Sequence, residues 1–185
     1  MEITKLYLDG LYVINQAVYP DARGYFSEIS RTEALSEALG RAINFVQSNV
    51  SYSEPKVLRG LHFQQPQAQG KLVRCLQGTI FDVAVDVRPH SATFGKAQTL
   101  ILSADNAQTI WIPEGFAHGF MVTAGPALVL YQCTALYAPQ CAYCLNAADA
   151  TLNIKWPFDP QDCIRSAQDA AAPLLKDLLP LLEEK

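Results

Sequence analysis

The stretch from Val57 to Arg74, VLRGLHFQQPQAQGKLVR, combines a histidine with fixed cations and contains no acid. His62 is one of three histidines in the chain, and Arg59 and Lys71 lie near it in sequence. Arginine and lysine can bind a phosphate or a developing oxyanion, and a neutral histidine can accept a proton near neutral pH. The combination indicates a general base acting on an anionic substrate. A lone histidine on an apolar strand is equally compatible with a structural role.

A carboxylate and a phenol extend this candidate site. Asp169 can orient the His62 imidazole if the C-terminal segment packs back over the sheet. Tyr131, in LVLYQC, is either a core tyrosine or a general acid facing the substrate from the side opposite His62. Arg59 and His62 are three residues apart, so a regular strand places them on opposite faces. A β-bulge at Gly60 would bring both side chains into one cavity.

Two further patterns bear on metal binding. The segment WIPEGFAHGF, residues 111–120, carries a P-x-G-x-x-H pattern that ends at His118 and is found in cupin barrels. Metal-binding cupins use a second histidine on an earlier strand, but this chain has Gln64 there, so we expect no metal site. The C-x-x-C motif at 141–144 lacks a second pair of ligands, and we interpret its cysteines as coincidental.

Short runs rich in Val, Ile, Tyr, Phe and Thr predict many strands. Alternation is clearest over residues 79–87, and turn signals include LQG ending at Gly78 and AGP at 124–126. Helical spacing is confined to residues 31–41 and to a C-terminal helix interrupted at Pro180. We therefore predict one mainly β domain over residues 1–185, a sandwich or jelly roll whose cavity could hold a small molecule.

Composition narrows the class of protein. The chain of 185 residues is 50% hydrophobic with a net charge of −4, which argues against a disordered tail and a broad nucleic-acid surface. It has no apolar run near the ~20 residues of a membrane helix and no secretion signal at its start. Five cysteines without an export signal indicate reduced thiols and a cytoplasmic protein.

Several long segments, in order, resemble the dTDP-4-dehydrorhamnose 3,5-epimerase family over nearly the whole chain. They are DARGYFSE, FVQSNVSYS, VLRGLHFQ, AQGKLVRCLQGTIFDVAVDVR, SATFG, LSADN, WIPEGFAHGF and IKWP. The resemblance implies a cupin-type β jelly roll, a homodimer, and no metal or other cofactor. It also implies a nucleotide-diphospho-4-keto-6-deoxyhexose as substrate and a place in deoxysugar or surface polysaccharide synthesis.

The resemblance further implies a role for each candidate residue. His62 matches the general base, Asp169 its acid partner, Tyr131 the general acid and Lys71 the residue that stabilises the enolate. Positions lining the substrate pocket match Arg23, Glu28, Gln47, Asn49, Arg59, His118 and Tyr137. The residue types suit the reaction, because carbons 3 and 5 flank a ketone and inversion needs a base and an acid on opposite faces.

The chain departs from the family pattern at several positions. Gln132 and Gln168 stand where lysine is common, Ala142 stands where an acid is frequent, and Lys96 and Ala97 follow TFG where an aromatic residue is common nearby. These departures leave open the nucleotide and whether C3, C5 or both are inverted. Three alternatives also remain at this point: a sugar 3,4-ketoisomerase, a non-catalytic nucleotide-sugar-binding protein and a metal-dependent cupin oxygenase.

Overall fold

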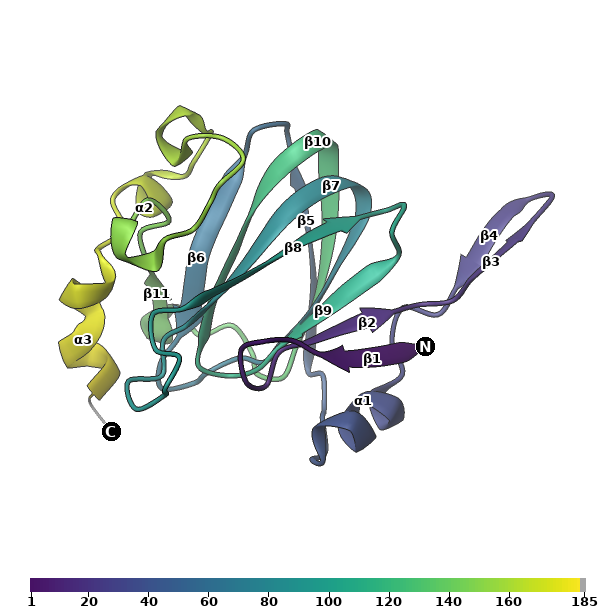
Figure 1. Cartoon of the computed structure of the whole chain (residues 1–185), viewed down its shortest axis with the longest axis horizontal. Helices are drawn as coiled ribbons and strands as arrows, with labels where there is room; N and C mark the ends of the chain where they lie inside the picture. The colour runs from purple at the N-terminus through teal and green to yellow at the C-terminus, as the bar shows by residue number, and fades with distance from the viewer. Residues whose placement is uncertain (184–185) are drawn as a thin grey trace.

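A nine-stranded antiparallel sheet curls into a barrel and forms the body of the molecule (Figure 1). The structure is a computed structural model that describes residues 1–183. The main strand order is β1-β2-β9-β7-β10-β6-β11, with β5 paired to β10 and β8 paired to β7. The strands are β1 (Glu2–Lys5), β2 (Tyr12–Asn15), β5 (Gln47–Ser53), β6 (Leu58–Gln64), β7 (Lys71–Asp86), β8 (Ala97–Ser103), β9 (Gln108–Ile112), β10 (Phe116–Cys133) and β11 (Ala142–Cys144). The predicted mainly β jelly roll is confirmed.

Two strands are much longer than the sequence predicts. β7 runs for 16 residues and β10 for 18, and they pair from Lys71 opposite Cys133 to Asp86 opposite Phe116. The glycines that we interpreted as turns, Gly78 and Gly125, lie within these strands with φ of 74° and 67°. Register shifts beside them mark β-bulges, which bend a strand without ending it. The two predicted turns are therefore wrong, and a continuous ribbon carries residues from one end of the barrel to the other.

Apolar side chains cover both faces of this ribbon. Ile80 and Ala84 belong to the core inside the barrel, whereas Val83 and Val85 pack outside it against the C-terminal segment. The alternation over residues 79–87 therefore separates two cores, not a core from solvent. Asp82 faces inward and is fully buried.

Helices cover the outside of the barrel. α1 (Thr32–Leu39) lies within the predicted helical segment 31–41, with Arg31 at its N-cap position and Gly40 at its C-cap position. α2 (Ala167–Ala170) precedes α3 (Leu175–Glu183), which runs through Pro180 without the predicted interruption. Buried leucines on α3 outweigh the one backbone hydrogen bond that proline removes. The 3-10 helices are η1 (Pro139–Cys141), η2 (Ala150–Leu152) and η3 (Pro160–Asp162).

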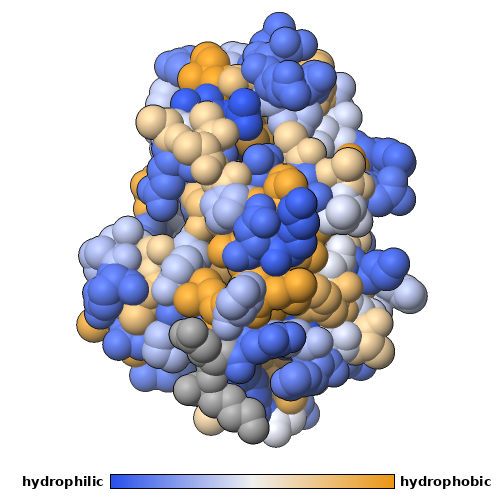
Figure 2. Space-filling model, turned by 90° about the vertical axis from the view of Figure 1, so that its left-hand side faces the viewer, coloured by the Kyte–Doolittle hydropathy of each residue, from blue (hydrophilic) through white to orange (hydrophobic). Residues whose placement is uncertain are grey.

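The side of the barrel carrying α3 shows hydrophobic residues surrounded by hydrophilic ones (Figure 2). α3 buries Leu175, Leu178 and Leu182 beneath this face. The end of the predicted C-terminal helix, residues 184–185, lies outside the described residues. Within residues 1–183, no helix combines the length and hydropathy needed to cross a membrane.

A two-stranded hairpin, β3 (Val18–Asp21) and β4 (Gly24–Ser27), projects away from the barrel (Figure 1). Its two strands pair only with each other. Tyr19, Tyr25 and Phe26 on it are each more than half exposed. The hairpin therefore buries few of its own aromatic side chains against the chain to which it belongs.

Candidate active site

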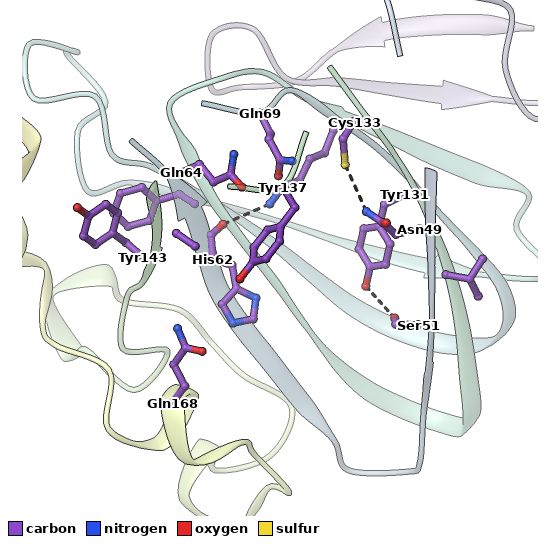
Figure 3. A pocket seen from close by; sticks show the side chains of 14 residues that line it. Asn49, Ser51, His62, Gln64, Gln69, Tyr131, Cys133, Tyr137, Tyr143 and Gln168 are labelled. Carbon is purple, nitrogen blue, oxygen red and sulfur yellow. Dashed lines mark hydrogen bonds between the residues drawn. The ribbon is translucent and has the colours of Figure 1, made fainter. Parts of the chain in front are cut away.

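A cavity of about 330 Å³ opens between β5, β6, β7, β10 and β11 (Figure 3). The volume is in the range of small-molecule sites. Its lining combines polar groups with aromatic rings, and α2 closes one side through Gln168. The lining residues are Asn49, Val50, Ser51, His62, Phe63, Gln64, Gln69, Lys71, Tyr131, Cys133, Tyr137, Ala142, Tyr143 and Gln168.

His62 and Asp169 form a hydrogen-bonded dyad at this cavity. His62 Nε2 lies 2.6 Å from Asp169 Oδ1, so the C-terminal segment does pack back over the sheet as expected. Ser166 caps α2 by accepting a hydrogen bond from the Asp169 backbone N–H, which fixes the carboxylate beneath β6. Burial by itself would raise the pKa of Asp169, but the hydrogen bond to His62 and its charge outweigh burial and lower that pKa to about 2. The carboxylate therefore stays ionised beside the imidazole.

A β-bulge brings Arg59 and His62 to the same side of β6. The two side chains are exposed on that strand while Leu58, Gly60 and Leu61 between and beside them are buried. Gly60 has φ of 104°, and a Cβ there would lie 2.7 Å from the His118 carbonyl oxygen, so only glycine fits. Arg59 donates to Ser53 Oγ at 2.8 Å and lies outside the cavity lining. Arg59 therefore shares the face of His62 on β6, but only His62 lines the cavity.

Lys71 and Tyr131 reach the cavity from β7 and β10. Lys71 Nζ donates to the His62 carbonyl oxygen at 3.4 Å, and burial lowers the pKa of its ammonium. The Tyr131 hydroxyl lies 2.9 Å from Ser51 Oγ, and burial raises the pKa of the phenol. Tyr131 and His62 lie on opposite walls, with Tyr137 between them in projection (Figure 3). An imidazole and a protonated phenol therefore face one another across the cavity.

His118 lies behind Tyr131 and not among the lining residues. Its ring packs edge-on against the Tyr131 ring with centroids 6.2 Å apart. His118 Nε2 is 2.8 Å from Asp82 Oδ2, and both residues are buried. His118 was expected to contact substrate, but its position supports Tyr131 from the rear. Asp82 escaped prediction, although an acid on so apolar a strand is a recognisable signal.

Polar residues of β5 form one wall of the cavity. Asn49 and Ser51 line the cavity, and Asn49 Nδ2 lies 3.9 Å from Cys133 Sγ. Gln47 lies outside the cavity lining. Its Oε1 accepts a hydrogen bond from the Tyr137 backbone N–H at 2.8 Å and so holds the loop that follows β10. Tyr137 itself lines the cavity.

Arg23 and Glu28 lie away from the cavity of their own chain. Arg23, at the tip of the β3–β4 hairpin, has a side chain 90% exposed and pairs with Asp21 at 2.6 Å. Glu28 pairs with Arg31 at 2.7 Å. Sequence reasoning placed both in the substrate pocket, and a single chain does not bring them there.

Cys144 is a site residue that sequence reasoning missed. Its Sγ lies 3.2 Å from Asp169 Oδ1, so the carboxylate oxygen that contacts His62 also accepts from a thiol. Within residues 1–183, His62, Cys144 and Asp169 are the one group of such side chains close enough to share a metal ion. All three are already joined by hydrogen bonds through that oxygen.

The fold and this cavity define an acid–base enzyme built on a β jelly roll. The chain belongs to the dTDP-4-dehydrorhamnose 3,5-epimerase family, whose model matches residues 5–177, and it is thus an isomerase. A curated relative of that name from Salmonella typhimurium is 44% identical over 97% of this chain and 98% of its own.

Solved structures agree with this assignment. An epimerase from Legionella pneumophila, in complex with dTDP-4-keto-L-rhamnose, superposes with a TM-score of 0.93 at 43% identity, covering 98% of this chain and 96% of its own. A 3'-monoepimerase from Streptomyces bikiniensis, in complex with dTDP-quinovose, has a TM-score of 0.89 at 31% identity, covering 95% and 89%. The neighbours thus include enzymes named for one inverted carbon and for two.

Proposed function

We propose that the chain inverts C3, C5 or both of a dTDP-linked 4-keto-6-deoxyhexose through acid–base chemistry of its own side chains. The observation that carries the proposal is the His62–Asp169 dyad facing Tyr131 across one cavity, with Lys71 beside the base. The names and ligands of the relatives support the dTDP-linked sugar as substrate.

Each proton and electron pair has a defined route. Asp169 engages His62 Nε2, which leaves Nδ1 to take the proton from the carbon beside the ketone. The C–H electron pair moves into a C=C bond, and the ketone becomes an enolate whose oxygen accepts from Lys71. Tyr131 then returns a proton to the opposite face of the carbon and regenerates the ketone. Solvent restores the phenol and removes the proton from His62.

Burial suits the acid to this task. Because burial raises the pKa of Tyr131, its phenol is protonated throughout the neutral range and can deliver a proton. Arg59 lies on the same face of β6 as His62 but outside the cavity lining, where its guanidinium can donate hydrogen bonds to the diphosphate.

The projecting hairpin supports a homodimer as part of this proposal. Tyr19, Tyr25 and Phe26 are exposed on it, and Val50 and Tyr52 are exposed on β5. A two-fold dimer that buries these surfaces would carry Arg23 from one chain toward the cavity of the other. Arg23 would then bind the substrate's anionic end, as the family resemblance implied.

The central experiment follows hydrogen exchange at the sugar ring. The protein is incubated in D2O with dTDP- and CDP-linked 4-keto-6-deoxyglucose, and NMR records which ring protons wash out and which product forms. We expect washout at C3, C5 or both with inversion, and loss of both in His62→Ala. Movement of the ketone would indicate a ketoisomerase. Ligand binding without any exchange would indicate a binding protein.

Mixing two inactive variants tests the shared cavity. In a 1:1 mixture of Arg23→Ala and His62→Ala, half the dimers are mixed, and one of the two sites in each mixed dimer has both residues. We expect the mixture to recover about a quarter of wild-type activity after subunit exchange. No recovery, or a monomeric mass in light scattering, would refute the exchange of the hairpin.

A further inference from the structure

The short edge strand β11 places Cys144 directly beside the proposed base. Cys144 and His62 are register partners in the β11–β6 pair. Reciprocal backbone hydrogen bonds between Leu61 and Leu145, at 3.1 and 2.8 Å, continue the pairing one residue further. Because side chains at paired positions lie on the same face of a sheet, the register directs the thiol and the imidazole to the same carboxylate.

One oxygen joins the three side chains. Asp169 Oδ1 lies 2.6 Å from His62 Nε2 and 3.2 Å from Cys144 Sγ. Cys144 is 6% exposed and Asp169 is 4% exposed, so water competes little for that oxygen. Burial first, and then the neighbouring Asp169, raise the pKa of Cys144 to about 12. The thiol therefore keeps its proton at neutral pH and can only donate to the carboxylate.

We propose that Cys144 is a positioning residue of the epimerase, whose S–H donation sets how strongly Asp169 holds the proton shared with His62. The inference rests on the proposed acid–base function. A donor on Oδ1 withdraws charge from the carboxylate and weakens its pull on the imidazolium. His62 can then give up its proton more readily after each turnover. Of the two cysteines in the C-x-x-C motif, Cys144 alone has this role.

The neighbouring Cys141 supplies a matched control. It is also buried, at 6% exposure, and lies three residues earlier at the end of η1. Within the described chain its thiol makes no hydrogen bond to either member of the dyad. Cys141→Ala therefore removes a buried thiol from the same edge of the sheet without touching Asp169.

The test orders variants by donor strength. The pH dependence of kcat/KM is measured for wild type, Cys144→Ala, Cys144→Ser and Cys141→Ala, after their melting curves establish folding. A hydroxyl donates more strongly than a thiol, and alanine does not donate. We expect the midpoint of the acidic limb to lie highest in Cys144→Ala, lower in wild type and lowest in Cys144→Ser, with steps on the order of 0.5 pH unit. Cys141→Ala should coincide with wild type.

A second readout separates this inference from the proposed function. NMR of imidazole-labelled protein follows the protonation of His62 in the same four proteins without substrate. The same order of midpoints supports the role of Cys144 even if the wild type fails to turn over the chosen sugar. Coincident curves for all four proteins, or an equal shift in Cys141→Ala, overturn the inference. If Cys144→Ala does not fold, Cys144→Ser is compared with wild type alone, and equal midpoints in these two proteins overturn the inference.

Discussion

Replacement of Asp169 by Asn removes the one charge that the dyad buries. The pKa of Asp169 falls from an ordinary 3.8 to about 2, which corresponds to about 2 kcal/mol of folding free energy. Because the folded form binds the proton more weakly than the unfolded chain, this contribution is complete above pH 4. It is lost as the pH falls toward 2.

Urea unfolding of wild type and Asp169→Asn between pH 3 and pH 7 measures this contribution. The free energies of unfolding should differ by about 2 kcal/mol at pH 7 and by about half of that at pH 3. Other carboxylates titrate in both proteins and cancel in the difference. Asp162→Asn, at an exposed position, is the control and should differ little from wild type at either pH.

Activity provides the second half of the assay. The neutral amide cannot stabilise the imidazolium, so we expect exchange at the sugar carbon to fall at least about 100-fold at pH 7. A stability difference independent of pH would refute the charged dyad. A variant that exchanges sugar protons at the wild-type rate would refute the role of Asp169 in the base.

Three further substitutions test other parts of the site. Tyr131→Phe should retain solvent exchange within about tenfold but lower inversion about 100-fold or more, because it removes only the returning proton; equal losses would contradict a separate acid. Lys71→Met should lower exchange and inversion together by about 10²–10³, and a loss below tenfold would contradict enolate stabilisation. Gly60→Ala should cost about 2 kcal/mol or more in urea unfolding, since φ is 104° and the His118 carbonyl is too close for a Cβ. A change under about 0.5 kcal/mol would contradict that crowding.

The sequence predicted the class of fold because alternation and β-branched residues recur throughout it. The prediction of individual turns failed where the same local signal is compatible with two structures. Gly78 and Gly125 adopt positive φ in bulges, and a turn uses the same conformation. Pro180 was predicted to interrupt the C-terminal helix but lies inside it. The packing of the buried leucines stabilises the helix, and a local sequence pattern does not show that packing.

The site was predictable in its residue types but not in its assembly. The contact of His62 with Asp169 joins residues 107 apart, and their spacing alone does not show it, because it depends on the C-terminal segment packing back over the sheet. Cys144 was dismissed because a C-x-x-C motif suggests metal or redox chemistry, whereas its partner is defined by strand register. Arg23 and Glu28 match the family pattern, but the fold of one chain leaves both side chains paired with neighbouring residues away from its cavity.

The half-buried side chain of Lys71 has a consequence for ligand binding. It forms no ion pair with any residue between 1 and 183, and burial lowers its pKa. An anionic sugar nucleotide entering the cavity restores the counter-charge and so raises that pKa. At a pH where Lys71 of the free protein is deprotonated, binding then takes up a proton from the buffer, and the measured enthalpy of binding depends on the buffer's own heat of ionisation. Affinity for the anion accordingly declines in alkaline solution.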